Sequence, residues 1–425
     1  MQNCKSAENR SHLCHIRIPR VYCTSTQNLW VQLPTGRCAI KSEHVRAKRA
    51  VHLSFIVNGF AWGSYIVRIP DVKQQFEITN SQLGLTLLAG TVGVLLAMKP
   101  SGTIVAKYGS SQCVIVGTAL LGITLFLLGF LLNYTWLVCS LFALGACAAL
   151  HDIAMNTHGS TLEKVTGQSM MNGFHARFSI GGFLGAAYGG ACSQFHIRPL
   201  IQLGLVAFIY FMMIPWLRKN LLPTDIDKHD KSISTEEPRE RAHIFYALGL
   251  LGFLASVCEG AASDWGAVLL RDTWNAAPFV SSIPYIVFSI TMLTGRLYGD
   301  RITKKFSREW IVRWGGAIAG AGLIVGLLIG GTIGVSLGWA VLGLGVSVAI
   351  PSVFSAAGQI ASTRFAGHVS PAAAVAVVGG VSYAGFLVGP PLIGFLADIV
   401  SLRWAMIVPA LLALAMSASS KIVAD

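Results

Sequence analysis

Charged side chains are scarce in this chain. Lysine, arginine, aspartate and glutamate make up 12% of its 425 residues, whereas hydrophobic residues make up 53%. Soluble domains carry about 25% charged residues. Of the 19 acidic residues, only Asp152, Glu259 and Asp264 lie well inside apolar stretches. This shortage of charge excludes an ordinary soluble domain and indicates a protein of the lipid bilayer.

Several functional motifs are also missing. No glycine-rich loop ends in Gly-Lys-Ser/Thr, and no His-Glu-x-x-His occurs, so neither ATP-driven transport nor a zinc protease is expected. The nine cysteines include no Cys-x-x-Cys pair, and we expect no metal and no cofactor. The formal net charge is +13, but no basic domain with interleaved aromatic residues is present. We therefore expect no nucleic-acid partner.

Apolar runs long enough to cross a bilayer occur twelve times. A bilayer core requires about 20 apolar residues per helix. We predict helices, because lipid leaves open backbone groups unsatisfied and the runs lack the alternation of barrel strands. The predicted spans are 51–69, 81–99, 112–132, 135–156, 173–192, 199–217, 244–270, 279–299, 310–332, 335–360, 372–396 and 403–421.

The distribution of lysine and arginine predicts the orientation of these spans. Nine basic residues precede the first span, six lie in 218–243 and six in 296–313. The loops on the opposite side carry only Arg68, Lys73, Arg198, Arg271 and Arg403. The positive-inside rule then places both termini in the cytoplasm. Residues 1–49 have no apolar central run, unlike a signal peptide, and we expect a disordered basic cytoplasmic tail.

An internal repeat divides the chain. The pattern Trp62-Gly63 followed by Arg68 recurs as Trp265-Gly266 followed by Arg271, 203 residues later. Further matches pair span four with ten and span five with eleven. The repeat predicts two six-helix bundles with the same polar end. We expect the N-terminal bundle at 50–218, a cytoplasmic linker at 219–243 and the C-terminal bundle at 244–421.

Five segments carry a resemblance to a known family. They are the glycine-rich ends of spans two and eight, Gly102–Gly109 and Gly295–Arg301, together with His151–Gly182, Glu259–Trp265 and Tyr383–Gly394. These resemble the major facilitator superfamily, and within it the bacterial MosC/YbjJ-like branch. The resemblance implies an all-α membrane protein with twelve transmembrane helices in two pseudo-symmetric halves. It also implies residence in the bacterial cytoplasmic membrane.

The resemblance further implies a function. We expect a secondary active transporter, and not an enzyme, that moves a small organic solute by alternating access. With no ATP-binding motif, the energy must come from a gradient of protons or another coupling ion. A uniporter or a drug or metabolite exporter is the alternative, and a non-transporting receptor ranks behind both. We expect the protein to work as a monomer in the lipid bilayer.

Glu259 is the candidate proton-coupling residue. It lies about fifteen residues into span seven, near the bilayer midplane, where ionisable groups are costly and usually functional. The alternative is a structural carboxyl group bonded to a neighbouring helix. Asp264 is the second proton-coupling candidate; it follows five residues later, about 140° around the helix, and need not face the same cavity. A structural cap or a partner in the external gate is the alternative for Asp264. Trp265 is expected in the interfacial aromatic belt.

Two groups of residues are candidates for gating at the cytoplasmic side. Asp152 in span four is expected to pair with Arg177 or His175 in span five, because a pair neutralises buried charge. A gating or structural pair is favoured over direct solute contact. In the family's gate loop, the first copy has Ala106 where the family has aspartate. The resemblance therefore implies a charge relay only in the second copy, at Asp300 and Arg301.

Several polar residues are candidates for solute binding, with helix joining as the alternative. They are Asn58, Trp62, Tyr65, Asp152, Asn156 and Gln359. The glycines of span five, Gly181 to Gly190, favour close helix packing over an antiporter motif. Gly389 and Pro390 in span eleven form a candidate hinge, with a static bend as the alternative.

Overall fold

We analysed a computed structural model of the whole chain. It describes residues 42–168, 170–224, 243–365, 369 and 371–424, together with two short strands, β1 (Val31–Gln32) and β2 (Cys38–Ala39). Residues 1–41 and 42–425 form separate compact units. In the first unit the strands pair antiparallel, with Val31 opposite Ala39. Most of the expected tail and of the expected linker lies outside the described residues.

Helices account for nearly all of the described second unit. They are α1 (Ser42–Ile66), α2 (Ile69–Gln75), α3 (Asn80–Tyr108), α4 (Ser110–Leu128), α5 (Tyr134–Thr166), α6 (Met171–Gln194), α7 (Pro199–Asn220), α8 (His243–Trp274), α9 (Pro278–Phe306), α10 (Arg308–Ile329), α11 (Gly331–Val346), α12 (Ala349–Thr363), α13 (Pro371–Val400), α14 (Leu402–Ala405) and α15 (Ile407–Ala418). A short 3₁₀ turn, Ser420–Val423, follows.

The predicted spans are confirmed as helices. Within the described residues, ten helical segments are long and apolar enough to cross a membrane. The other two predicted spans fall on α6 and on the shorter apolar run Leu402–Ala418. The tenth span is interrupted between α11 and α12, and the first is followed at once by α2. The first helix begins at Ser42, so part of the expected tail is helical.

The ends of the helices follow from local sequence. Thr79 and Gln82 form a reciprocal capping box at the start of α3, and the Asn133 side chain accepts from the Trp136 amide at the start of α5. The gate segments Gly102–Gly109 and Gly295–Arg301 were expected to be loops after spans two and eight, and that expectation is wrong. Both segments are helical: α3 continues to Tyr108 and α9 to Phe306, and the chain turns only at Gly109, with φ +83°, and at Ser307, with φ +81°. Each connection is then a single residue.

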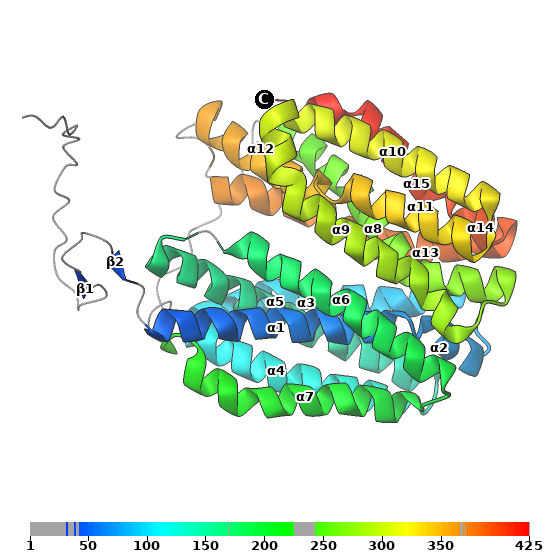
Figure 1. Cartoon of the computed structure of the whole chain (residues 1–425), viewed down its shortest axis with the longest axis horizontal. Helices are drawn as coiled ribbons and strands as arrows, with labels where there is room; N and C mark the ends of the chain where they lie inside the picture. Colours follow the sequence, from blue (N-terminus) through cyan, green and yellow to red (C-terminus); the bar gives the residue numbers. More distant parts are fainter. Residues whose placement is uncertain are drawn as a thin grey trace, which may run out of the picture. The chain divides into compact units, whose positions relative to one another are not determined.

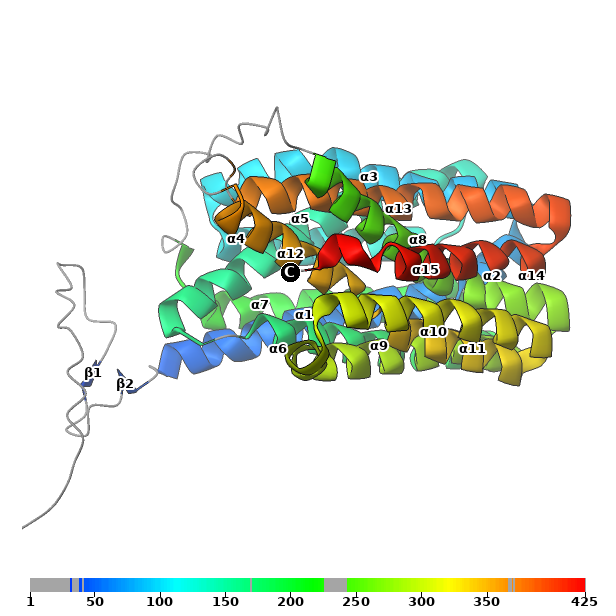
Figure 2. The same cartoon turned by 90° about the horizontal axis from the view of Figure 1, so that it is seen from above.

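The packing repeats between the first seven helices and the rest. The pair α1–α6 corresponds to α8–α13, α3–α5 to α9–α11, and α4–α7 to α10–α15, all of which are in contact. Two further contacts, α6–α9 and α3–α13, join the two sets and correspond to each other in the same way. Figures 1 and 2 show the two sets of ribbons, with α3 and α13 side by side. This doubling of contacts supports the predicted repeat.

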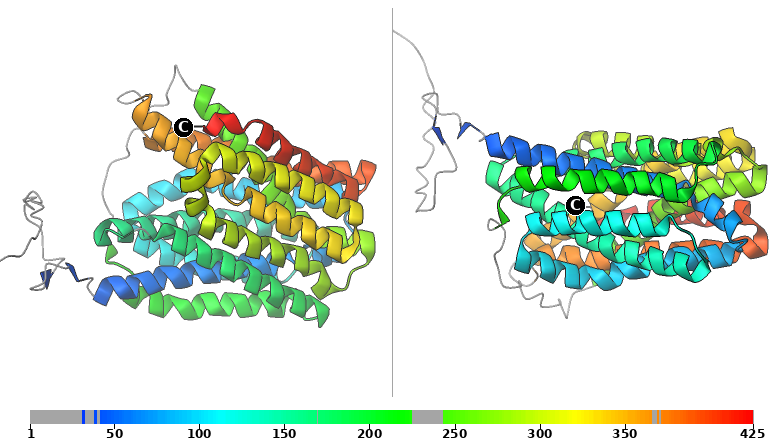
Figure 3. Two further views of the ribbon diagram at one scale, coloured as in Figure 1. Left: turned by 45° about the horizontal axis from the view of Figure 1, so that its top comes forward. Right: turned by 90° about the horizontal axis from the view of Figure 1, so that it is seen from below.

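Glycine allows α1 and α6 to approach closely. A Cβ atom added to Gly63 would lie 2.0 Å from the Gly182 carbonyl oxygen, and one on Gly181 would lie 2.0 Å from that of Ile56. Gly59 and Gly185 meet the partner backbone equally closely. The predicted packing role of these glycines is confirmed. On the other side of α1, the right panel of Figure 3 shows α7 (green) between α1 (blue) and α4 (cyan).

Trp265 does not lie in an interfacial belt, and that expectation is wrong. Its side chain is fully buried, with 0% exposure. The reason is that α8 packs against α9, α11, α13 and α15, which leaves this face no lipid contact. The indole instead lies close to Gly394 of α13.

Candidate functional site

An ion pair between α8 and α9 lies halfway along the second set of helices. Arg296 Nη2 and Glu259 Oε1 are 3.4 Å apart, and about a quarter of each side chain is exposed. Glu259 is near the middle of α8, as expected. Its cationic partner was not anticipated. The signal was available, because Arg296 lies inside the apolar run 279–299, and a charge within a span is a functional candidate by default.

Tyr285 of α9 lies near this ion pair. The Tyr285 hydroxyl lies within electrostatic range of Glu259, Asp264 and Arg296. Asp264 therefore shares one polar cluster with Glu259, although the two differ by about 140° around α8. Tyr65 of α1 is also within range of Asp264, which brings the first set of helices into the cluster. We call Glu259, Asp264, Tyr285 and Arg296 the central cluster.

Asp152 lies on α5, in the other set of helices. It is exposed, although its neighbours Ala154 and Met155 are buried. A charged side chain does not face hydrocarbon, so its exposed position indicates a polar space between the two sets. Tyr383 of α13, itself 40% exposed, lies within electrostatic range of both Asp152 and Glu259. These two carboxyl groups therefore border the same region.

The expected pairing of Asp152 is wrong. Its carboxylate accepts from the Asn156 amide at 3.0 Å, while Arg177 Nη1 donates to the Gly173 carbonyl at 3.0 Å. Asp152 lies fourteen residues before the end of α5, and Arg177 six residues after the start of α6. At about 1.5 Å per residue, the two differ by roughly 12 Å along the helices, which is too far for a salt bridge. His175 is exposed and packs edge-on against Phe55.

The predicted polar face of α1 points partly into its own set of helices. Asn58 is 5% exposed, and its side-chain oxygen accepts from the buried Tyr210 hydroxyl at 3.3 Å. Trp62 and Tyr65 are in edge contact, and with Asn58 they border a cavity of only about 10 Å³. This placement supports the helix-joining alternative for Asn58. Tyr65 also lies close enough to Asp264 for an electrostatic interaction.

The remaining candidates lie away from the central cluster. Gln359 accepts from Arg308 near the end of α12, and Arg301 stacks over Tyr298 with 5.8 Å between the guanidinium carbon and the ring centre. The Asp300 side chain lies outside what the structure describes. Helix α13 continues through Gly389 and Pro390, and the Pro390 carbonyl lies against Gly84 of α3. The hinge at this point stays a prediction.

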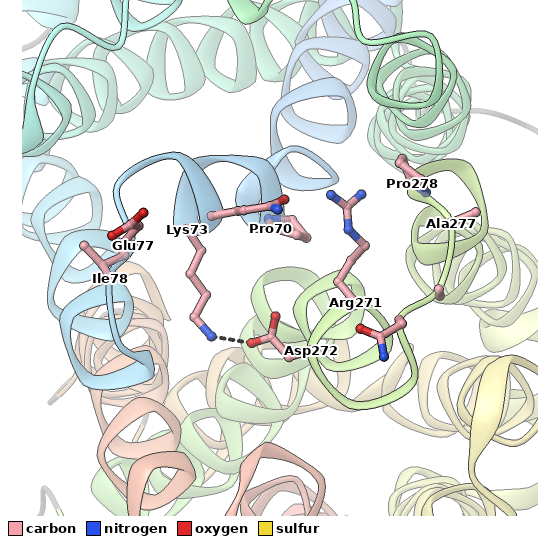
Figure 4. A pocket seen from close by; sticks show the side chains of 11 residues that line it. Pro70, Lys73, Glu77, Ile78, Arg271, Asp272, Ala277 and Pro278 are labelled. Carbon is pink, nitrogen blue, oxygen red and sulfur yellow. Dashed lines mark hydrogen bonds and ion pairs between the residues drawn. The ribbon is translucent and has the colours of Figure 1, made fainter.

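A second polar cluster lies at the end of the bundle that contains α2, seen at the right of Figure 1. We call it the Asp71 end, and the opposite end the Gly109 end. Asp71 Oδ1 accepts from Arg271 Nη2 at 2.9 Å, and Lys73 forms an ion pair with Asp272. Figure 4 shows Lys73, Arg271 and Asp272 around a hollow of about 690 Å³ between α2 and the α8–α9 connection. No pattern in the sequence singles out Asp71.

The hydrogen bonds between the two sets of helices are not evenly distributed. Among the described residues, the one nearest the middle joins Thr91 Oγ1 to the Phe386 carbonyl. The others lie at the Asp71 end, where Asp398 also accepts from the backbone amides of Asn80 and Ser81 at 3.1 and 2.9 Å. The two sets are thus fastened together at the Asp71 end.

Comparison with known proteins identifies a family. Residues 51–373 match the family model described as Major Facilitator Superfamily. An uncharacterised MFS-type transporter of Yersinia pestis is 31% identical over 375 residues, which cover 88% of this chain and 95% of that protein. Membrane protein MosC of Rhizobium meliloti is 28% identical over 358 residues, covering 84% and 85% of the two chains.

Solved structures share the fold at low sequence identity. A mutant form of the nucleoside transporter NupG superposes with a TM-score of 0.73 at 12% identity, covering 89% of this chain and 99% of its own. An inward-facing, occupied structure of a bacterial homologue of the lysosomal transporter Spinster gives 0.71 at 12% identity, covering 91% and 97%. FucP in the outward conformation gives 0.62 at 16% identity, covering 90% and 100%.

Proposed function

This chain belongs to the major facilitator superfamily, and from that membership we propose that it is a proton-coupled secondary active transporter of a small organic solute. It is a membrane transporter and not an enzyme. The observation that carries the finer proposal is the central cluster. Charged groups at this depth cost about 2.5–3.5 kcal/mol each on the insertion scale, so their presence in α8 and α9 requires a use.

We propose that residues 50–218 and 244–421 are the two halves that rock against each other around the central cluster. The corresponding contacts α6–α9 and α3–α13 support this division. Basic residues concentrate toward the Gly109 end, so the positive-inside rule places that end, and both termini, in the cytoplasm of a bacterial cell. The fastened Asp71 end is then external, and the structure is an inward-facing state.

Glu259 is the proposed coupling residue. When ionised, it holds Arg296 on α9; when protonated, it loses the charge that attracts the guanidinium. Proton binding thereby loosens a link between the two helices. Asp264 is the second candidate, because it shares Tyr285 as a neighbour with Glu259. Asp152 and Asn156 form the proposed solute-binding group on the opposite wall, with a carboxylate acceptor and an amide in adjacent turns.

The solute class is found by a thermal-shift screen of purified protein. A ligand that binds the folded state raises its stability with concentration. The screen includes sugars, polyols, amino acids and cationic drugs, and also nucleosides, since NupG is a nucleoside transporter. A hit is then offered to proteoliposomes with and without a pH gradient. Accumulation only with the gradient supports proton coupling, whereas simple equilibration in both cases indicates a uniporter.

A further inference from the structure

Asp71 has three side-chain partners at the end of the bundle where the two sets of helices are hydrogen-bonded. Arg68 Nε lies 2.9 Å from Oδ2, and the Ser193 hydroxyl donates to the same oxygen at 2.6 Å. Arg271 binds Oδ1 at 2.9 Å. Arg68 and Ser193 belong to the same set of helices as Asp71, and only Arg271 comes from the other set. The carboxylate is therefore positioned by its own half before Arg271 arrives.

The two arginines occupy equivalent positions in the repeat. Each follows a Trp-Gly pair by the same spacing, at Arg68 and at Arg271. They converge on one carboxylate, and the position 203 residues after Asp71 is Trp274, which has no charge. Both arginines therefore bind the same carboxylate, Asp71, and the second half has no equivalent carboxylate at position 274. This asymmetry gives Asp71 a counterion from its own half and another from the opposite half.

A second ion pair between α2 and α8 has its charges the other way round: the cation is on α2 and the anion on α8. Asp71 and Lys73 lie on α2, and they meet Arg271 and Asp272 respectively, as Figure 4 shows for Lys73. If α2 shifted along α8 so that the partners exchanged, like charges would face each other. The two ion pairs therefore favour a single closed arrangement.

We propose that Asp71 is a gating residue: it closes this end by binding Arg271, and it keeps Arg68 as its counterion when Arg271 leaves. This inference rests on the proposed alternating-access transport. Separating a carboxylate from its only partner leaves an unpaired charge, which strongly opposes opening. Because Arg68 stays with Asp71, opening costs one ion pair and creates no unpaired carboxylate. Arg68 therefore favours the open state, although it touches the closed gate.

The test is the accessibility of a buried position beneath the gate. Ser282 of α9 is 0% exposed and lies against Gly190 of α6, between the two sets. Ser282→Cys is made in a cysteine-free background of the full chain, and the rate of its reaction with a polar methanethiosulfonate reagent is measured in detergent. The rate reports the fraction of molecules open at this end.

Asp71→Asn and Arg271→Gln remove the link between the halves and should each raise the reaction rate about tenfold. Arg271→Lys keeps the charge and should restore most of the protection. Arg68→Gln should instead lower the rate severalfold, because it leaves Asp71 with Arg271 as its only cation. A rate that rises in Arg68→Gln as it does in Asp71→Asn would overturn the proposal, as would an unchanged rate in Asp71→Asn.

Two controls keep this outcome interpretable. The melting temperature of each variant shows whether it is folded. An Asp71→Glu variant is the conservative replacement if Asp71→Asn does not fold. Asp71→Glu should retain partial protection of the cysteine, and full loss of protection would contradict the proposal. The labelling needs no solute and no gradient. If wild-type protein shows no transport but the opposite effects of Asp71→Asn and Arg68→Gln are found, the gate stands and the proposed proton-coupled transport fails.

Discussion

Replacing Glu259 by glutamine should separate solute movement from proton movement. Glutamine preserves the shape of the side chain and its hydrogen-bonding capacity, but it cannot take up or release a proton at neutral pH. The variant should bind solute and exchange it across the membrane. It should not accumulate solute when a pH gradient is applied.

The structure sets the scale of this effect. At 3.4 Å, the attraction between Glu259 and Arg296 is about 5 kcal/mol at an effective dielectric constant of about 20. Desolvation and partial exposure reduce the net value to about 1–3 kcal/mol. One pH unit supplies about 1.4 kcal/mol per proton, enough for roughly tenfold accumulation. The energy of releasing Arg296 is therefore comparable with the energy that the gradient provides.

The assay uses proteoliposomes with a gradient of one pH unit and a radiolabelled solute identified by the screen. Wild-type protein should reach an inside-to-outside ratio of up to about tenfold for one proton per solute. Glu259→Gln should reach a ratio of about one, with counterflow exchange intact. Arg296→Lys is the matched control, since it keeps the cation beside Glu259 and should retain accumulation. Accumulation by the glutamine variant would refute the role of Glu259 and transfer it to Asp264 or Asp152.

Three other changes test the orientation in the membrane, the packing of α1 against α6 and the role of Asp300. A reporter inserted at residue 230 should be protected from external reagents in intact cells, and an external signal there would contradict the orientation. Gly63→Leu should abolish folded protein in fluorescence-detected size exclusion, because even its Cβ would lie 2.0 Å from the Gly182 oxygen, whereas Gly102→Leu, where an added Cβ meets nothing within 4 Å, should be tolerated. Asp300→Asn should shift the balance of inward and outward states without abolishing solute binding; unchanged transport kinetics together with unchanged cytoplasmic accessibility would rule this out.

The length and spacing of apolar runs in the sequence predict the helices well. The apolar runs determine where the spans lie, because the bilayer imposes a minimum length and excludes other backbone structures. The repeat of Trp-Gly and arginine placed both arginines at one end, and the structure confirms this. Glycines at every fourth position in span five predicted a close helix contact, and the structure shows that the partner of α6 is α1.

Composition and period do not determine which residues from distant segments come into contact. Glu259 was selected as a lone midplane carboxyl group, but its partner Arg296 depends on how α9 is rotated against α8. Asp71 looked like an ordinary loop residue, because its importance arises only when Arg68 and Arg271 converge on it. Trp265 was assigned to an interface because a single helix cannot show which of its faces its neighbours cover.

Proton movement driven by the solute is the most direct test of coupled transport. Proteoliposomes containing wild-type protein and a pH-sensitive dye, without an imposed gradient, receive a solute that stabilises the protein in the thermal-shift screen. We expect a pH change inside the vesicles that starts with solute addition, scales with the amount of solute transported and disappears in Glu259→Gln. Solute entry at the wild-type rate with no change in internal pH would contradict it.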